Sequence, residues 1–372
     1  HIIIQAYKKI KKIIMEIVNI DIWSENLELT RPYSISYETI SSVENIFVRL
    51  ELEDGTWGIG AGSPAEFVTG ENIPFALSSL KKYSKDLILY KDIEAFDLIV
   101  HSVENSFSNA PAAKAALDIA LYDIYTKYKK IPLVDYFGRC HNDILTSITI
   151  GIQSIDETIK DALEHVSNGF HALKLKTGIN INHDIEMIAN VRKAIGDEIL
   201  IRVDANQGYD IDDLLSFIRR TEKFNIEIIE QPFTVANNQH MDNLSEDHRL
   251  ICMADESLHT NKDAIELSAQ PHKFGVYNIK LMKCGGLTEA KKIANTAHAA
   301  GIDLMWGCMD ESVVSITAAL HLALASPKTK YLDLDGSFDL AKDLFAGGFK
   351  LIDGKLILSE LNGLGVFDNK YE

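Results

Sequence analysis

The sequence predicts an α/β protein: a (β/α)8-type barrel of the modified TIM kind, with an N-terminal α+β capping domain that the C-terminal tail completes. Short β-branched runs alternate with helical stretches from about residue 144 onward. Before them, an alternating strand meander is followed by helices, and after them the tail has hairpin character without room for another strand–helix unit. A chain of 372 residues can hold both parts, since a barrel takes about 250 residues.

We expect four segments along the chain. Residues 1–14 are apolar and basic but lack a signal-peptide cleavage site, and Met15 opens a segment that reads as a natural beginning. We therefore expect residues 1–14 to be a disordered upstream extension. Residues 15–140 are expected to form the capping domain, 141–340 the barrel with the metal and catalytic residues, and 341–372 a segment that packs on the capping domain.

The capping domain is predicted from two kinds of periodicity. Residues 17–23 and 45–52 alternate as strands do, and a turn at 53–55 leads into a third strand. Residues 74–130 indicate helices, most clearly Ala112–Lys127, where apolar side chains recur every three or four residues.

The predicted barrel has eight strands, because repeated strand–helix units imply parallel strands and eight of them close into a barrel. The expected strands are Leu145–Ile150, Ala172–Lys176, Ile199–Asp204, Glu227–Glu230, Ile251–Asp255, Val276–Lys280, Asp303–Trp306 and Tyr331–Asp335. The expected helices between them include Asp156–Ser167, His183–Ile195, Ile211–Phe224, Thr288–Ala299 and Ser312–Leu324.

Composition excludes several classes of function. The net charge of −17 repels phosphate backbones and anionic lipids, so we expect neither nucleic-acid nor membrane binding. No apolar run reaches the ~20 residues that span a bilayer. The four cysteines stand far apart without a CxxC pair, which favours a reducing compartment. With no export signal, we expect a cytoplasmic protein.

Charged residues close the predicted strands at a regular spacing. Lys176, Asp204, Glu230, Asp255 and Lys280 follow one another at intervals of 28, 26, 25 and 25 residues, about one strand–helix unit each. The active site of such a barrel lies where the strands end, so these side chains are expected on one rim. The next two ends bring a neutral Cys308 and then Asp333-Leu334-Asp335.

These residue types indicate proton transfer beside a metal. Asp204, Glu230 and Asp255 form a hard oxygen site that suits Mg²⁺. Lys176 and Lys280 flank it, and a nearby cation such as Lys174 or the metal, or partial burial, would lower a lysine pKa enough for it to act as a base. The metal would stabilise an enediolate formed next to a carboxylate. Two opposed lysines favour an epimerase or racemase and also permit an elimination.

Five motifs together resemble the enolase superfamily, in the muconate cycloisomerase subgroup, over nearly the whole chain from Met15. They are KLK (174–176), RVDANQGY (202–209), IEQP (229–232), ADES (254–257) and NIKLMKCGG (278–286). The resemblance implies the barrel fold, Mg²⁺ and a lysine base. Members similar to mandelate racemase carry a catalytic histidine near the sixth and seventh strands, where this chain has Lys280, so that subgroup is disfavoured.

Within the subgroup the chain looks like a dipeptide epimerase. The resemblance implies that Asp333 and Asp335 bind the ammonium group of a small-molecule dipeptide. It implies Mg²⁺-dependent epimerisation at the α-carbon of the C-terminal residue, of L-Ala-D/L-Glu or a related dipeptide, with Lys280 rather than Lys283 as the second base. A homo-oligomer is possible. The remaining substrate positions that the resemblance implies are Thr149, Lys174, Cys308, Met309 and Asp310.

One departure keeps the substrate open. Relatives selective for Ala-Glu carry a capping-loop arginine, and here Glu38 aligns near that position, with Arg31 the nearest arginine. Ala-Glu is the default, but another second residue remains possible, and so do peptidoglycan recycling and general peptide catabolism as the pathway. Rival functions are o-succinylbenzoate synthase and N-acylamino acid racemase, which use the same lysines and metal but leave the Asp pair idle, and a non-catalytic ligand-binding protein.

Overall fold

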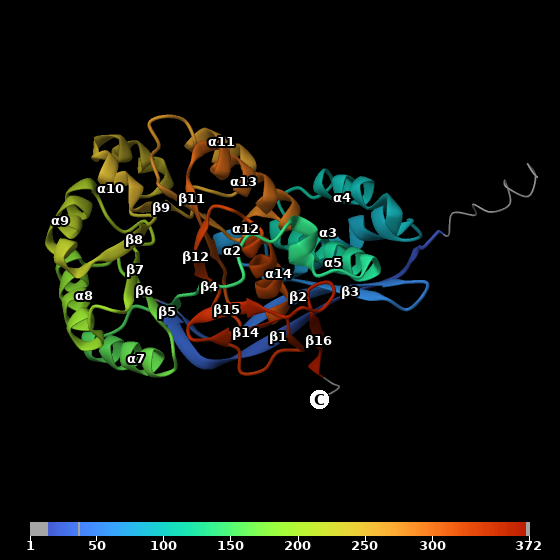
Figure 1. Cartoon of the computed structure of the whole chain (residues 1–372), viewed down its shortest axis with the longest axis horizontal. Helices are drawn as coiled ribbons and strands as arrows, with labels where there is room; N and C mark the ends of the chain where they lie inside the picture. The colour runs from blue at the N-terminus through green and yellow to red at the C-terminus, as the bar shows by residue number, and fades with distance from the viewer. Residues whose placement is uncertain (1–13, 36–37, 370–372) are drawn as a thin grey trace, which may run out of the picture.

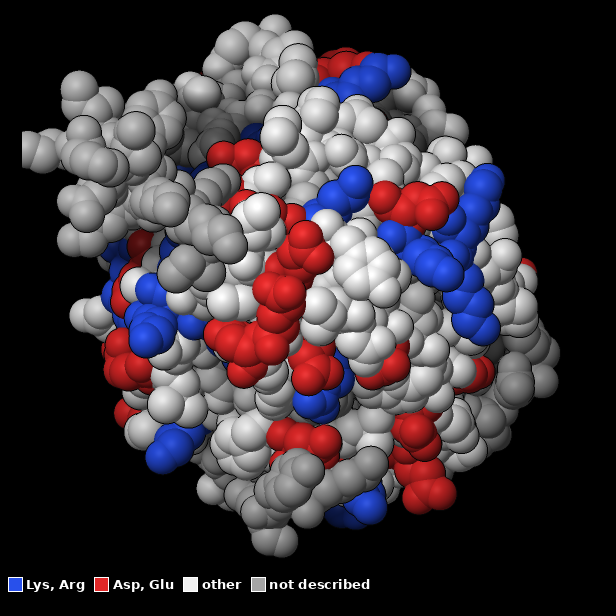
Figure 2. Space-filling model, turned by 90° about the vertical axis from the view of Figure 1, so that its right-hand side faces the viewer, with Lys and Arg blue, Asp and Glu red and all other residues white. Residues whose placement is uncertain are grey.

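The computed structural model describes residues 14–35 and 38–369. Residues 1–13, which make up nearly all of the predicted upstream extension, lie outside the described residues. Figure 1 shows a ring of strands and helices on one side and the capping domain, with its long antiparallel strands, on the other. No helix in the described part of the chain is long and apolar enough to cross a membrane. On the face seen in Figure 2, acidic and basic side chains are interspersed.

Eight parallel strands form the barrel, in the order β12-β11-β10-β9-β8-β7-β6-β5, and the predicted fold class is confirmed. The two outer strands of this order meet through a bridge between Thr146 and Leu332, and Ser147 N–H donates to the Leu332 carbonyl at 2.9 Å. The strands are β5 (Ile148–Ile150), β6 (Ala172–Lys176), β7 (Leu200–Asp204), β8 (Ile226–Glu230), β9 (Cys252–Ala254), β10 (Val276–Ile279), β11 (Asp303–Gly307) and β12 (Thr329–Asp333).

The prediction of one barrel strand at Leu145–Ile150 is wrong, because two separate strands lie there. The first is β4 (Ile144–Leu145), which pairs with a strand of the C-terminal tail, and only β5 belongs to the barrel. Thr146 N–H still donates to Gly354 of the tail, whereas Ser147 N–H donates to Leu332 of the barrel. The chain therefore changes sheets between these two residues, which apolar periodicity alone does not reveal.

Helices surround the barrel in the expected places. Helix α7 begins with a capping box, in which Ser154 and Glu157 satisfy each other's backbone N–H groups. The predicted helix Ile211–Phe224 ends three residues early and continues as a 3₁₀ turn, Glu222–Phe224. The helices are α7 (Ile155–Ser167), α8 (Ile181–Ile195), α9 (Ile211–Thr221), the 3₁₀ segment Val235–Asn243, α10 (Glu246–Leu250), α11 (Asn261–Leu267), α12 (Leu281–Cys284), α13 (Leu287–Ala300) and α14 (Val313–Leu324).

The capping domain packs a three-stranded antiparallel sheet on helix α5. The glycines of WGIGAG face this helix: a Cβ at Gly60 would lie 1.9 Å from the Ala116 carbonyl oxygen. Alternate glycines therefore allow the close approach of strand and helix. The elements are β1 (Ile17–Ile35), β2 (Glu38–Leu52), β3 (Trp57–Gly62), α2 (Glu66–Thr69), α3 (Ile73–Ile88), the 3₁₀ turn Ile93–Ala95, α4 (Phe96–Glu104), α5 (Pro111–Lys129) and α6 (Leu133–Phe137).

The C-terminal tail forms two small sheets beside the capping domain. Strands β14 (Phe349–Ile352) and β15 (Lys355–Leu358) pair with β4, and β13 (Phe345–Gly347) pairs with β16 (Val366–Asp368). The ring of Phe345 packs against Phe47 and Trp57, with centroids 5.9 and 6.4 Å apart. These aromatic contacts fix the tail to the antiparallel sheet.

A buried histidine joins helix α14 to α6 and to the tail. His321 is fully buried; its Nδ1 accepts from the Val134 N–H at 2.9 Å, and its Nε2 lies 3.2 Å from the Leu364 carbonyl, to which it must donate. This pair of contacts requires the neutral ring with the proton on Nε2. Burial lowers the pKa of His321 to about 4, because the charged ring would lose its hydration.

The protein is therefore expected to lose stability as the pH falls from about 6.5 toward 4. The unfolded histidine binds a proton in this window and the folded one does not, so the free energy of unfolding should fall by about 2 kcal/mol between pH 7 and pH 5 from this residue alone. Urea unfolding of His321→Gln should lack this contribution, while the exposed His298→Gln should keep it. An equal loss in wild type and His321→Gln would contradict the assignment.

Candidate active site

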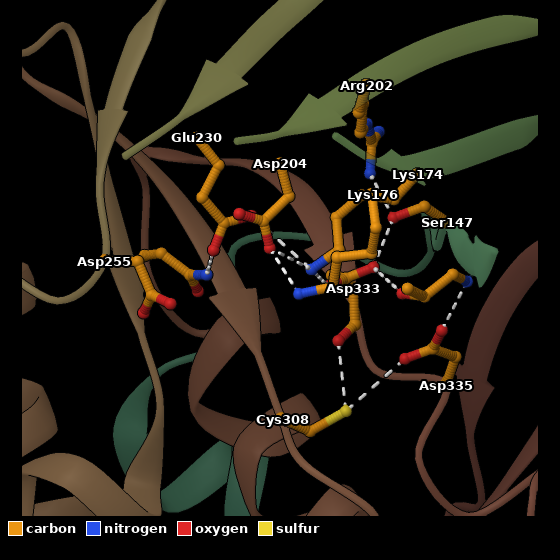
Figure 3. A network of polar contacts seen from close by, with 12 residues as sticks. Ser147, Lys174, Lys176, Arg202, Asp204, Glu230, Asp255, Cys308, Asp333 and Asp335 are labelled. Carbon is orange, nitrogen blue, oxygen red and sulfur yellow. Dashed lines mark hydrogen bonds and ion pairs between the residues drawn. The ribbon is translucent and has the colours of Figure 1, made fainter. Parts of the chain in front are cut away.

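The register of the barrel places charged strand ends side by side. Lys176 is the ladder partner of Asp204, and Asp204 is the partner of Glu230. Asp255 and Lys280 follow β9 and β10 directly, so they are the first residues of the loops rather than the last of the strands. Figure 3 shows Lys174 and Lys176 directed toward Asp204 at this end of the barrel.

The two candidate bases lie at opposite ends of the row of carboxylates. Lys176 Nζ donates to Asp204 Oδ2 at 2.6 Å and to Asn206 Oδ1 at 2.9 Å. Lys280 Nζ donates to Asp255 Oδ2 at 2.8 Å. Glu230 lies between these two pairs in strand order.

Lys174 is the buried cation of the site. It forms an ion pair with Asp333 and lies 3.4 Å from Glu230 Oε2 and 3.7 Å from Asp204 Oδ2. Burial would lower its pKa, but Asp333, Glu230 and Asp204 together raise it well above the usual value. Lys174 therefore stays protonated and supplies a fixed positive charge.

The pKa of Lys280 is raised where its ammonium group contacts the acids of the site, whereas the sequence predicts that a neighbouring cation such as the metal would lower it. Burial lowers the pKa of this side chain, yet the attraction of Asp255 and Glu230 outweighs burial and raises it. The physical reason is direct contact with a buried carboxylate, which favours the ammonium form. Unless another cation engages these acids, Lys280 is a proton donor.

The three carboxylates have different proton affinities. Burial and the neighbouring Asp204 raise the pKa of Glu230 to about 8. Asp255 is buried too, but Lys280 and Lys283 hold its pKa well below the usual range. Asp204, Glu230 and Asp255 are each nearly or fully buried, and carboxylate oxygens are the ligands that Mg²⁺ prefers. As they stand, each is paired with lysine, and in residues 14–35 and 38–369 no three His, Cys, Asp or Glu side chains are close enough to hold a metal ion.

Two further residues contact the acids: Lys283, which ranked second as the base on sequence grounds, and Asn278, which was not identified from the sequence. Lys283, the second choice as base, donates to both the carbonyl and the carboxylate of Asp255. Asn278 donates from Nδ2 to Glu230 Oε1 at 2.8 Å. Asn278 could have been found, because it precedes Lys280 by two residues and strand side chains alternate.

The Asp pair gathers with two of the predicted substrate residues. Thr149 N–H donates to Asp335 Oδ2 at 2.7 Å, and the Cys308 thiol lies 3.2 Å from the Asp333 carbonyl and 3.5 Å from Asp335 Oδ1. Burial and the neighbouring Asp333 raise the pKa of Asp335 to about 6. Within the described part of the chain, no lysine or arginine forms an ion pair with Asp335.

The loop after β11 connects the mouth to the capping domain. Met309 N–H donates to Glu311 Oε1 at 3.0 Å. The Asp310 carbonyl accepts from Asn45 Nδ2 at 3.4 Å and from Ser63 Oγ at 3.2 Å. Side chains of the capping domain thus hold the backbone of this loop in position.

Arg31 faces the barrel helix α7. It pairs with Glu164 and lies 3.7 Å from Asp161 Oδ1. Glu38 begins β2, but its side chain lies outside the described residues. The arginine that was the nearest candidate for a glutamate side chain is therefore already engaged by two acids.

Comparisons with known proteins agree with this geometry. The family model described as "Mandelate racemase / muconate lactonizing enzyme, N-terminal domain" matches residues 17–138, and "Enolase C-terminal domain-like" matches residues 157–369. Together the two matches cover the capping domain, the tail and the barrel from residue 157 onward, and they leave out residues 139–156, which include β5.

Three relatives are similar over nearly their full length. The L-Lys-D/L-Arg epimerase of Desulforapulum autotrophicum is 48% identical over 95% of this chain and 99% of its own. The L-Ala-D/L-Glu epimerase of Clostridium acetobutylicum is 34% identical over 95% of this chain and 99% of its own. The crystal structure of a dipeptide epimerase from Methylococcus capsulatus, complexed with Mg and the dipeptide L-Arg-D-Lys, is 44% identical with a TM-score of 0.92, covering 94% of this chain and 99% of that one.

Proposed function

This chain belongs to the mandelate racemase / muconate lactonizing enzyme family of the enolase superfamily and is an isomerase, and we propose that it epimerises dipeptides at the α-carbon of their C-terminal residue. The observation that carries the proposal is the arrangement at one barrel mouth. Two lysines stand at opposite ends of three buried carboxylates, and an Asp pair lies beside them.

Asp204, Glu230 and Asp255 are proposed to hold Mg²⁺. The fit rests on their oxygen chemistry, their burial and the raised pKa of Glu230, which burial and the neighbouring Asp204 cause and which a divalent cation would lower. When bound, the ion supplies the positive charge that stabilises an enediolate.

The proton steps belong to the two lysines. One of Lys176 and Lys280, in its neutral form, takes the α-proton from one face, and the electron pair passes into the carboxylate to give the enediolate. The other, as an ammonium ion, donates a proton to the opposite face and inverts the carbon. The exchange balances, because one lysine gains the proton that the other loses.

Asp333 and Asp335 are proposed to bind the ammonium group of the dipeptide. Asp333 already neutralises Lys174, whereas Asp335 has Thr149 N–H and the Cys308 thiol as its neighbours. A positively charged group of the substrate beside Asp335 would lower its raised pKa, because a cation stabilises the ionised carboxylate.

We propose that the substrate carries cationic side chains rather than glutamate. Partial burial and the charges of Asp335 and Asp310 raise the pKa of Asp339 to about 7, so a cation near these three acids would be stabilised. Arg31 is held by acids of α7. The relatives named for Lys and Arg are also more similar to this chain than the L-Ala-D/L-Glu epimerase named above.

Proton NMR in D₂O with Mg²⁺ tests the proposal. L-Lys-L-Arg and L-Arg-L-Lys are expected to lose the C-terminal α-proton signal and to gain peaks of the epimer. Their kcat/KM should exceed that of L-Ala-L-Glu by about 100-fold, the scale of one well-placed charge interaction. A preference for L-Ala-L-Glu would overturn the cationic substrate class alone. No exchange with any dipeptide would overturn epimerisation and favour the o-succinylbenzoate synthase or N-acylamino acid racemase reaction.

A further inference from the structure

Beneath the Asp pair, three side chains connect across the barrel interior. Arg202 Nη1 donates to Ser147 Oγ at 3.2 Å, and Ser147 Oγ–H donates to Asp333 Oδ1 at 2.6 Å (Figure 3). Arg202 and Asp333 are 2% exposed and Ser147 is fully buried. Arg202 comes from β7 and Asp333 from β12, so the contacts cross from one wall of the barrel to the other.

The direction of the serine hydroxyl follows from its two neighbours. A hydroxyl has one hydrogen and accepts through its lone pairs. Because the guanidinium can only donate, Ser147 must accept from Arg202 and keeps its hydrogen for another group. The Leu332 carbonyl is 3.2 Å away and accepts from Arg202 at 2.6 Å, whereas Asp333 is charged and closer. The hydrogen therefore goes to the carboxylate.

The arginine itself has little freedom. Its Nε donates to Glu227 Oε2 at 3.0 Å, and its guanidinium lies over the ring of Tyr331, 5.0 Å from the centroid. A planar group held by several contacts in this way does not rotate readily. The position of Ser147 Oγ is fixed in turn.

Both oxygens of Asp333 are thereby occupied: Oδ1 by Ser147 and Oδ2 by Lys174. Asp335 instead accepts from the Thr149 N–H and lies 3.5 Å from the Cys308 thiol. We propose that Ser147, fixed by Arg202, is a positioning residue that sets the orientation of Asp333 and through it the affinity of the mouth for the substrate ammonium group. This inference rests on the proposed dipeptide epimerase function.

The test is Ser147→Ala, assayed by α-proton exchange with L-Lys-L-Arg. Loss of one charge-assisted hydrogen bond to Asp333 is expected to raise KM about 10-fold and to leave kcat within about twofold of wild type. The inhibition constant of Nα-acetyl-L-Lys-L-Arg, which lacks the α-ammonium group but keeps the side-chain charges, should not change. Mg²⁺ affinity by calorimetry should not change either, because Ser147 contacts none of the three proposed ligands.

The matched control is Ser84→Ala in helix α3, another buried serine, whose hydroxyl donates to the Leu80 carbonyl at 2.6 Å. It should leave both constants unchanged. If Ser147→Ala does not fold, Ser147→Cys retains the volume, donates only weakly and carries the same expectation.

The outcomes separate this inference from the proposed function. If the wild type exchanges the α-proton of dipeptides and Ser147→Ala has the wild-type KM, the positioning role is overturned and epimerisation stands. An equal loss of affinity for the free and the N-acetylated dipeptide would show a general structural effect and also overturn it. Wild type without any dipeptide exchange would overturn the proposed function first.

Discussion

Replacement of Lys176 by alanine is expected to reduce kcat for epimerisation by at least about 10³-fold, the usual contribution of a positioned acid–base group. Lys176 closes β6 and its ammonium group lies against Asp204 and Asn206, at the edge of the proposed metal ligands. Its removal takes away the base on one side of the substrate without touching the Asp pair. The affinity for a dipeptide, measured by calorimetry, should stay within a few fold.

The stereochemistry of the remaining exchange tests the two-base mechanism. With one lysine gone, the variant should still exchange the α-proton of one epimer in D₂O, because the other lysine still reaches its own face. Lys280→Ala should show the same loss with the opposite epimer. If either single variant exchanged both epimers at the wild-type rate, the two-lysine mechanism would be rejected.

Lys283→Ala decides between the two lysines that contact Asp255. Lys283 is nearly fully buried and donates to both the carbonyl and the carboxylate of this residue, so its role is expected to be structural and electrostatic. It should retain exchange from both epimers. Loss of exchange from one epimer in Lys283→Ala, but not in Lys280→Ala, would reassign the second base to Lys283.

The row of strand-end residues could be predicted because the signal is local. Period-two alternation within a strand and one strand–helix unit between strands together place Lys176, Asp204 and Glu230 on one rim, and the ladder pairs the three as neighbours. Strand ends were less accurate: Asp255 and Lys280 lie just beyond β9 and β10. Either position still directs a side chain to the mouth, since the loops begin there.

The sequence could indicate only some of the properties of Ser147 and Arg202, the residues that lie behind the site. Ser147 and Arg202 precede Thr149 and Asp204 by two residues and so share their face, but the sequence does not say that they contact each other across the barrel. The raised pKa of Lys280 was also missed. The pKa of Lys280 rises or falls according to whether Lys280 itself or another cation pairs with Asp255. This depends on distances between side chains, which the order of residues does not give.

The contacts that hold the capping domain to the tail are the least visible in the sequence. Asp123 of α5 is fully buried and accepts from Ile59 N–H at 2.9 Å and Leu364 N–H at 2.8 Å, partners 64 and 241 residues away. Lys127 Nζ completes the site at 2.8 Å. A Cβ at Gly363, whose φ is +69°, would lie 2.3 Å from Asp123 Oδ1, so the tail approaches as closely as only glycine permits.

Asp123→Ala is therefore expected to lower the free energy of unfolding by about 3–5 kcal/mol, because it leaves two buried N–H groups and a half-buried ammonium without their acceptor. Urea unfolding followed by circular dichroism measures the change. Limited proteolysis should cut the tail near residue 363 first, since the Leu364 contact is lost.

The matched control uses the neighbouring lysine of the same helix. Lys129 pairs with Glu94 at 2.8 Å, but both side chains are 32% exposed, so water competes for each charge. Glu94→Ala should cost less than about 1 kcal/mol, as exposed ion pairs do. Equal effects of the two substitutions would mean that the carboxylate of Asp123 stabilises the fold only through its lysine. A larger effect at Asp123 would show that the backbone of β3 and of the tail depends on this one buried acid.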